Sequence, residues 1–147
     1  MNKTNLFAIK FKFSMTRNHN AALLILRLSI GVLMLLHGID KIFHGIDSIV
    51  DMMKEIGMPG SFAYGVYIGE VLAPLLLIIG FRARIAAMLL VMNMLVIIFI
   101  AHPGQIFELN QHGAWALELP GLYLSGTLAV IFTGGGRYAI SSKNRWD

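Results

Sequence analysis

Long apolar stretches alternate with short polar segments along the whole of this chain. Four stretches are each close to the roughly 20 residues with which an α-helix crosses a bilayer, and they cover residues 21–39, 62–80, 83–101 and 115–134. The pattern predicts an all-α protein, a four-transmembrane-helix bundle over residues 21–138. Residues 1–20 are expected to form a basic N-terminal tail, either disordered or lying on the membrane, and residues 139–147 a cytoplasmic C-terminal tail.

The connection between the first two stretches has a helical pattern of its own. Apolar residues recur at helical spacing from Ile46 to Ile56, and acidic residues occupy another side. We therefore expect a short amphipathic helix in this first outer loop, ending where Gly57 and Pro59 interrupt it. Inside the second stretch, Pro74 lacks a backbone N–H and is expected to kink the helix just after Glu70.

Composition supports the membrane assignment and narrows the chemistry. Of the 147 residues, 56% are hydrophobic and 14% are charged, and the mean hydropathy is +0.70, which is more apolar surface than a soluble domain of this size buries. There is no cysteine, which excludes disulfides and thiolate-ligated clusters within the chain. Any electron transfer would therefore need a borrowed cofactor or a partner protein.

Basic residues predict the orientation, because short loops rich in Lys and Arg stay in the cytoplasm. Nine of them fall on one side of the predicted bundle: Lys3, Lys10, Lys12, Arg17, Arg82, Arg84, Arg137, Lys143 and Arg145. The other side has only Lys41 and Lys54, among several acidic residues. Both termini are thus expected in the cytoplasm, in an inner (plasma) membrane protein. The net charge of +4 follows from this topology, so the lipid bilayer is the expected partner and nucleic acid is not.

Charged residues inside the apolar stretches are candidate functional residues, because such side chains are costly in hydrocarbon and normally pair with one another. Counting about 1.5 Å per residue places Arg27 about 9 Å from the cytoplasmic end, and Glu70 and Asn93 about 15 Å. These depths predict one buried polar cluster in which Arg27 pairs with Glu70. The cluster could be structural, or a pocket for a headgroup, a quinone carbonyl or a proton; alternatively, Arg27 extends to the cytoplasmic interface and never meets Glu70.

A second polar cluster is expected near the outer surface, where His37, His102 and Glu118 lie at the ends of their stretches. Imidazole and carboxylate groups bind several divalent metals and exchange protons. Because no closely spaced ligand pair accompanies them, we predict no metal site. The nine methionines are interpreted as adaptable packing rather than as copper ligands. No nucleophile with an adjacent base and no phosphate-binding loop is present, so no catalytic residue is assigned.

Three groups of residues together resemble a known family. The first group is Leu26-Arg27-Leu28, Gly31, His37-Gly38 and Lys41; the second group is Glu70 with Gly80-Phe81 and Arg84; the last is Gly113, Glu118, Gly134, Gly136, Arg137 and Tyr138. Over about residues 22–140 this set resembles the signatures of the DoxX family of small bacterial and archaeal membrane proteins.

The resemblance implies a four-helix membrane bundle linked to respiratory or redox chemistry, because the family takes its name from a quinol-oxidising or thiosulfate-oxidising membrane complex. Other members of the family are associated with oxidative-stress assemblies. We expect a subunit or accessory of a quinone-linked or oxidative-stress system, with redox partner proteins, a homo-oligomeric state and a quinone as ligand, but with no cofactor held by the chain alone. Two alternatives stay open: a proton-coupled carrier in which Glu70 and Glu118 titrate, and a structural assembly factor without chemistry of its own.

Overall fold

The computed structural model describes residues 3–142, 144, 146 and 147, and the side chains from residue 19 onward. Across these residues every regular element is helical, apart from one isolated bridge between Leu109 and Trp115. The predicted all-α class is therefore confirmed. The elements are α1 (Lys3–His44), α2 (Asp47–Glu55), η1 (Gly60–Tyr64), α3 (Gly65–Tyr67), η2 (Ile68–Leu72), α4 (Ala73–Ile79), α5 (Ala83–Val96), η3 (Ile97–Ala101), η4 (Pro103–Gln105) and α6 (Glu118–Thr133).

Within the described chain, three helical segments are long and apolar enough to cross a membrane: His19–His44, Gly60–Ile79 and Ala83–Ala101. The fourth apolar stretch forms α6, which has only 16 residues. At 1.5 Å per residue α6 is about 24 Å long, which is shorter than the hydrocarbon core of about 30 Å. It begins later than expected because the preceding residues, Trp115 included, fold into a hairpin. The structure thus has three candidate spans, one fewer than predicted.

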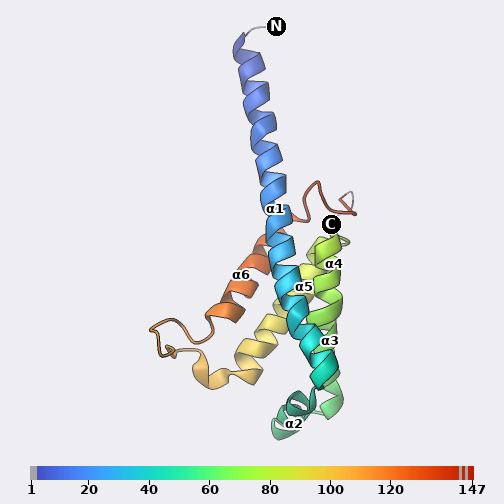
Figure 1. Cartoon of the computed structure of the whole chain (residues 1–147), viewed down its shortest axis with the longest axis vertical. Helices are drawn as coiled ribbons and strands as arrows, with labels where there is room; N and C mark the ends of the chain where they lie inside the picture. The colour runs from blue at the N-terminus through green and yellow to red at the C-terminus, as the bar shows by residue number, and fades with distance from the viewer. Residues whose placement is uncertain (1–2, 143, 145) are drawn as a thin grey trace.

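The first helix is much longer than its apolar stretch. α1 has 42 residues, and its N-terminal part extends well beyond the other helices (Figure 1). The expected boundary at residue 21 is therefore not a helix start, because the backbone is already helical from Lys3. Lys143 and Arg145 of the basic C-terminal tail lie outside the described residues, as do the side chains of the basic residues before His19.

Two glycines bring α1 close to the second span. A Cβ atom on Gly31 would lie 2.6 Å from Cγ1 of Ile78, and one on Gly38 would overlap the carbonyl oxygen of Glu70. Small residues allow such approach where water provides no hydrophobic drive between helices. These contacts set the register of the two antiparallel helices: Gly38 lies level with Glu70, and Gly31 lies level with α4.

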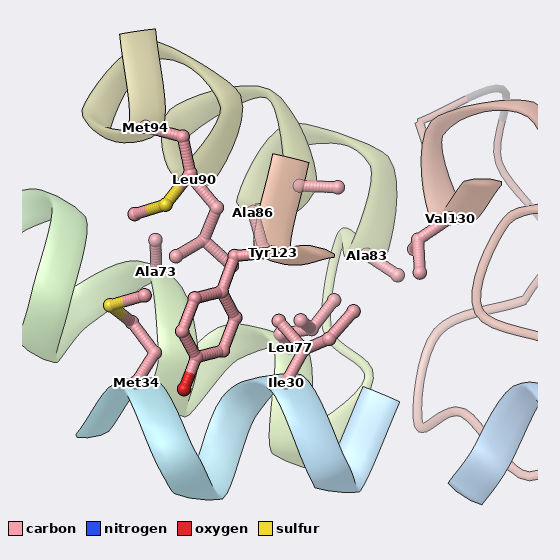
Figure 2. Close-up of a cluster of buried hydrophobic side chains, with 11 residues drawn as sticks. Ile30, Met34, Ala73, Leu77, Ala83, Ala86, Leu90, Met94, Tyr123 and Val130 are labelled. Carbon is pink, nitrogen blue, oxygen red and sulfur yellow. The ribbon is translucent and has the colours of Figure 1, made fainter. Parts of the chain in front are cut away.

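One core joins the four long helical segments. Figure 2 shows the ring of Tyr123 extending from α6 toward α1, where it lies close to Met34 and Leu77. The cluster also contains the buried side chains Ile30, Ala73, Ala83, Ala86, Ala87, Leu90, Met94 and Val130. Its alanines keep α5 close to its neighbours, so the half of the bundle nearer the C-terminus is tightly packed.

The second and third spans each contain a widened, π-helical turn, at η2 and η3. In η2 the cause lies in Pro74, which cannot donate to the carbonyl of Glu70 and whose ring would collide with it in a regular α-helix. The irregularity expected near Glu70 therefore takes the form of a wider turn. The short helix expected in the first loop is also present as α2, with Met53 buried and Asp47, Asp51 and Glu55 exposed.

Candidate functional site

A cavity of about 710 Å³ lies between the helices at the end of the bundle where α2 is found. Side chains of α1, α2, α5 and α6 line it, together with both π-helical turns. Six of the nine methionines in the chain are among its lining residues: Met34, Met52, Met53, Met58, Met92 and Met94. The walls are therefore mostly apolar and adaptable, since methionine fills irregular spaces without a fixed shape.

The principal charged feature of the cavity is an ion pair between Lys41 and Glu70. The Lys41 Nζ atom lies 2.5 Å from Oε2 of Glu70. The Glu70 side chain is 4% exposed and that of Lys41 is 23% exposed, so the carboxylate depends on this ammonium for its counter-charge. Lys41 lies in the last turn of α1, where the helix dipole favours a cation, and its carbonyl oxygen accepts a hydrogen bond from the Tyr67 hydroxyl at 3.3 Å.

Asn93 contributes a donor for which the described residues provide no acceptor. Its side chain lies directly over Gly69, where a Cβ atom would come within 2.5 Å of the amide carbon of Asn93. The Nδ2 atom is buried and has no hydrogen-bond partner among the described residues. Gly69, Glu70 and Asn93 all line the cavity. The site therefore combines a neutralised ion pair with an unsatisfied amide N–H group.

Arg27 is not part of this site, and the expected ion pair with Glu70 is wrong. Arg27 is fully buried, and its Nη2 atom donates to the carbonyl oxygen of Tyr138 at 3.3 Å. Its Nη1 atom fills the space beside Gly80, where no Cβ could fit. Because Gly38 is level with Glu70, Arg27 lies about 16 Å further along α1. Counting residues from the ends of the apolar stretches assumes that these ends lie level with each other. They do not, because α1 continues past the end of α4, and Arg27 itself lies beside Gly80.

The surroundings of Arg27 explain how its charge is tolerated without a carboxylate. It lies beside the C-terminal ends of α4 and α6, close to Gly80 and Gly135, where helix dipoles place negative potential. Its Nε and Nη1 atoms have no hydrogen-bond partner among the described residues. Of the three interpretations of Arg27, the extension toward the end of the bundle agrees with this geometry.

The residues after α6 fold across the same end, and we name residues 134–142 the C-terminal strap. The Arg137 N–H donates to Oδ1 of Asn20 at 2.9 Å. Further along, the N–H groups of Ile140 and Ser141 donate to the carbonyls of Ile79, the last residue of the second span, and of Gly80, at 3.3 and 3.1 Å. The strap thus connects α1, α4 and α6 at the end of the bundle opposite α2 (Figure 1).

The three residues of the expected outer cluster are only partly brought together. His37 and His102 line the cavity, and the His37 ring lies edge-on to Tyr123 at a centroid distance of 6.5 Å. Glu118 is exposed at the start of α6 and is not among the lining residues. In the described part of the chain, no three His, Asp or Glu side chains are grouped so as to hold a metal ion.

Sequence reasoning missed Lys41 as the partner of Glu70, although it included Lys41 in a family signature. The available signal was the helical spacing of Gly38 and Lys41, three residues apart and therefore on one face of α1. Whether Glu70 and Asn93 bind a ligand stays a prediction.

Comparison with known proteins adds one finding. The family model DoxX matches residues 22–103, more than half of the chain. The matched segment contains Lys41, Glu70 and Asn93 and ends before the hairpin and α6, so the last group of signature residues lies outside it. No curated protein and no solved structure matches the chain.

Proposed function

This chain belongs to the DoxX family, and from that premise we propose that it binds a quinone, or a similar neutral lipophilic carbonyl compound, in the cavity beside Lys41 and Glu70. In this proposal it is a subunit or accessory of a membrane redox system. The observation on which the proposal depends is the buried Asn93 Nδ2 group, which has no partner in the described chain and belongs to a residue that lines a cavity with a neutral ion pair.

The charge of the site favours an uncharged ligand. Glu70 already neutralises Lys41 at 2.5 Å, so a charged ligand would have to break that pair or remain unpaired in an apolar environment. An unsatisfied N–H donor, by contrast, gains free energy from any acceptor that replaces the missing partner. A carbonyl oxygen on an apolar ring meets both conditions.

Size and wall chemistry agree with such a ligand. A volume of about 710 Å³ falls within the range of roughly 300–1,000 Å³ typical of small-molecule sites. The methionine side chains can adjust to a flat ring and a hydrocarbon tail. Widened helical turns often occur at functional sites, and here η2 and η3 both border the cavity.

We further propose that α6 is the fourth span and that both termini are cytoplasmic, in an inner (plasma) membrane. Arg27, Arg82 and Arg137 lie at the same end of the bundle as the strap, and a positively charged end favours the cytoplasmic side. The short α6 would span with local thinning of the bilayer or with help from its flanking segments.

The redox role itself requires other molecules. The chain has no cysteine, so electrons would be carried by the bound quinone and by partner proteins, and a homo-oligomer is compatible with this arrangement. We therefore propose a binding subunit rather than a self-sufficient oxidoreductase.

A carrier that uses Glu70 and Glu118 has less support. Glu118 lies outside the cavity lining, and the tightly packed core and the buried Arg27 separate the cavity from the opposite end. Binding from one end explains this geometry with fewer assumptions than transport through the bundle.

A binding measurement tests the proposal. We would titrate the full-length protein in lipid nanodiscs with a short-chain benzoquinone and a short-chain naphthoquinone, using calorimetry. Asn93→Leu removes the donor at similar volume and should weaken binding about tenfold, which corresponds to about 1.4 kcal/mol. Glu70→Gln should weaken it as well.

The matched control is Asp51→Asn, which breaks the exposed Lys54–Asp51 pair on α2 and should leave affinity unchanged. Wild-type protein that binds neither quinone would overturn the proposal, as would an Asn93→Leu variant with unchanged affinity. Loss of folded protein in the Glu70 variant, together with no quinone binding by the wild type, would favour the structural assembly factor.

A further inference from the structure

Residues 106–117, between η4 and α6, form a defined hairpin rather than an open loop. Leu109 and Trp115 pair in antiparallel fashion, the Asn110 N–H donates to the Ala114 carbonyl at 2.7 Å, and the Ala116 N–H donates to the Glu108 carbonyl at 2.9 Å. At the tip, Oδ1 of Asn110 accepts hydrogen bonds from two backbone N–H groups. The backbone is thus held in one conformation.

Trp115 attaches the hairpin to α6. Its ring lies against Gly121, where a Cβ atom would overlap the indole, and its Nε1 atom donates to the carbonyl oxygen of Ile106 at 2.8 Å. A displacement of the hairpin would therefore also displace the first turns of α6. Leu119 and Tyr123 of those turns line the cavity.

The hairpin presents apolar side chains away from the protein. Phe107 is 97% exposed and Leu109 is 70% exposed. Glu108 is the only Lys, Arg, Asp or Glu between residues 102 and 117, and it stands between Phe107 and Leu109. Successive side chains in a strand point to opposite faces, so its carboxylate can stay in the headgroup region while its two neighbours enter an apolar environment. On α6, Leu122 is also 68% exposed.

The position of the hairpin indicates what covers this surface. In Figure 1 it projects sideways from the ends of η3 and α6, beside the bundle and not beyond α2. Lipid surrounds the sides of a membrane-spanning bundle, so a lateral projection meets lipid. Non-helical backbone is not stable in the hydrocarbon core when exposed to lipid, whereas the headgroup region provides hydrogen-bond partners and accepts aromatic side chains.

We propose that the 106–117 hairpin is a membrane-interface anchor, with Phe107 and Leu109 inserted among the lipid acyl chains just below the headgroups. This role is independent of the quinone. It extends the membrane contact of a helix that is too short to span comfortably, and it holds one wall of the cavity at the level of the interface.

The absence of cysteine in the native chain permits a direct test. Phe107→Cys and Leu109→Cys would each be labelled with a nitroxide in the full-length protein, reconstituted in phosphatidylcholine–phosphatidylglycerol vesicles. Power saturation would then compare the accessibility of each label to oxygen, which is enriched in lipid, and to a water-soluble nickel chelate. Gln111→Cys at the exposed tip is the aqueous control, and Leu122→Cys on α6 is the lipid-facing control.

We expect oxygen to relax labels 107 and 109 several-fold more than the nickel chelate does, as for label 122, and the reverse for label 111. Preferential relaxation of labels 107 and 109 by the chelate would overturn the proposal, because the hairpin would then lie in water. Protection of these labels from both reagents would also overturn it, in favour of a protein partner or a second copy. Circular dichroism of each variant establishes that it is folded, and two label positions guard against failure of one.

Discussion

Removal of the Lys41 charge should destabilise the protein, because it leaves the Glu70 carboxylate without a counter-charge in an apolar cavity. Breaking a buried ion pair by loss of one partner costs about 3–5 kcal/mol. The Glu70 side chain is 4% exposed but that of Lys41 is 23% exposed, so the variant carboxylate retains some access to solvent. We therefore expect Lys41→Met to lower the free energy of unfolding by an amount at the lower end, about 3 kcal/mol.

The double variant separates the ion pair from side-chain packing. In Lys41→Met/Glu70→Gln no charge remains buried, so most of the loss should be recovered, leaving a deficit of about 1 kcal/mol. Because Glu70→Gln also lowers stability, a double-mutant cycle over these variants should then give a coupling of more than about 2 kcal/mol.

The assay is reversible unfolding in mixed micelles of increasing sodium dodecyl sulfate content, followed by circular dichroism. Lys54→Met is the matched control, because the Lys54–Asp51 pair has a similar length, 3.0 Å, but its side chains are 61% and 69% exposed; its loss should cost less than about 1 kcal/mol. A Lys41→Met variant as stable as the wild type would contradict this expectation, and so would a double variant no more stable than Lys41→Met alone.

Other substitutions test the packing around both buried groups. Gly80→Ala should cost about 3 kcal/mol or more in the same unfolding assay, because its φ of +72° strains alanine and its Cβ would displace Arg27; Gly104→Ala, which meets nothing within 4 Å, should change stability by less than about 0.5 kcal/mol. Gly69→Ala should push the Asn93 amide out of place and weaken quinone binding about tenfold in calorimetry, and undiminished affinity would separate Asn93 from the site. Arg27→Met should make the strap more sensitive to limited proteolysis, since the contact with Tyr138 is lost; an unchanged cleavage rate would show that Arg27 does not hold it.

The corrected position of Arg27 changes how the intramembrane charges are understood. Arg27 and Glu70 serve separate ends of the bundle: the former is enclosed by helix ends and the strap, and the latter is paired with Lys41 in a cavity. Loss of Arg27 is therefore expected to affect stability, whereas changes at Glu70 should affect both stability and ligand binding.

Sequence alone determined the features that depend on local physics. Apolar stretches of bilayer length specify helices because a backbone in lipid must satisfy its own hydrogen bonds. The helical spacing of apolar residues over 46–56 specifies α2, and Pro74 requires an irregular turn near Glu70. The family signature was likewise readable, and the family model matches it over residues 22–103.

Tertiary structure alone decided which buried groups meet. The offset between α1 and α4 depends on where Gly31 and Gly38 allow the helices to approach, and this packing cannot be obtained by counting residues from the ends of apolar stretches. That offset places Lys41, rather than Arg27, opposite Glu70. The cavity and the late start of α6 likewise follow from contacts between distant segments, because a sequence pattern specifies which residues favour lipid but not how far apart the helices diverge.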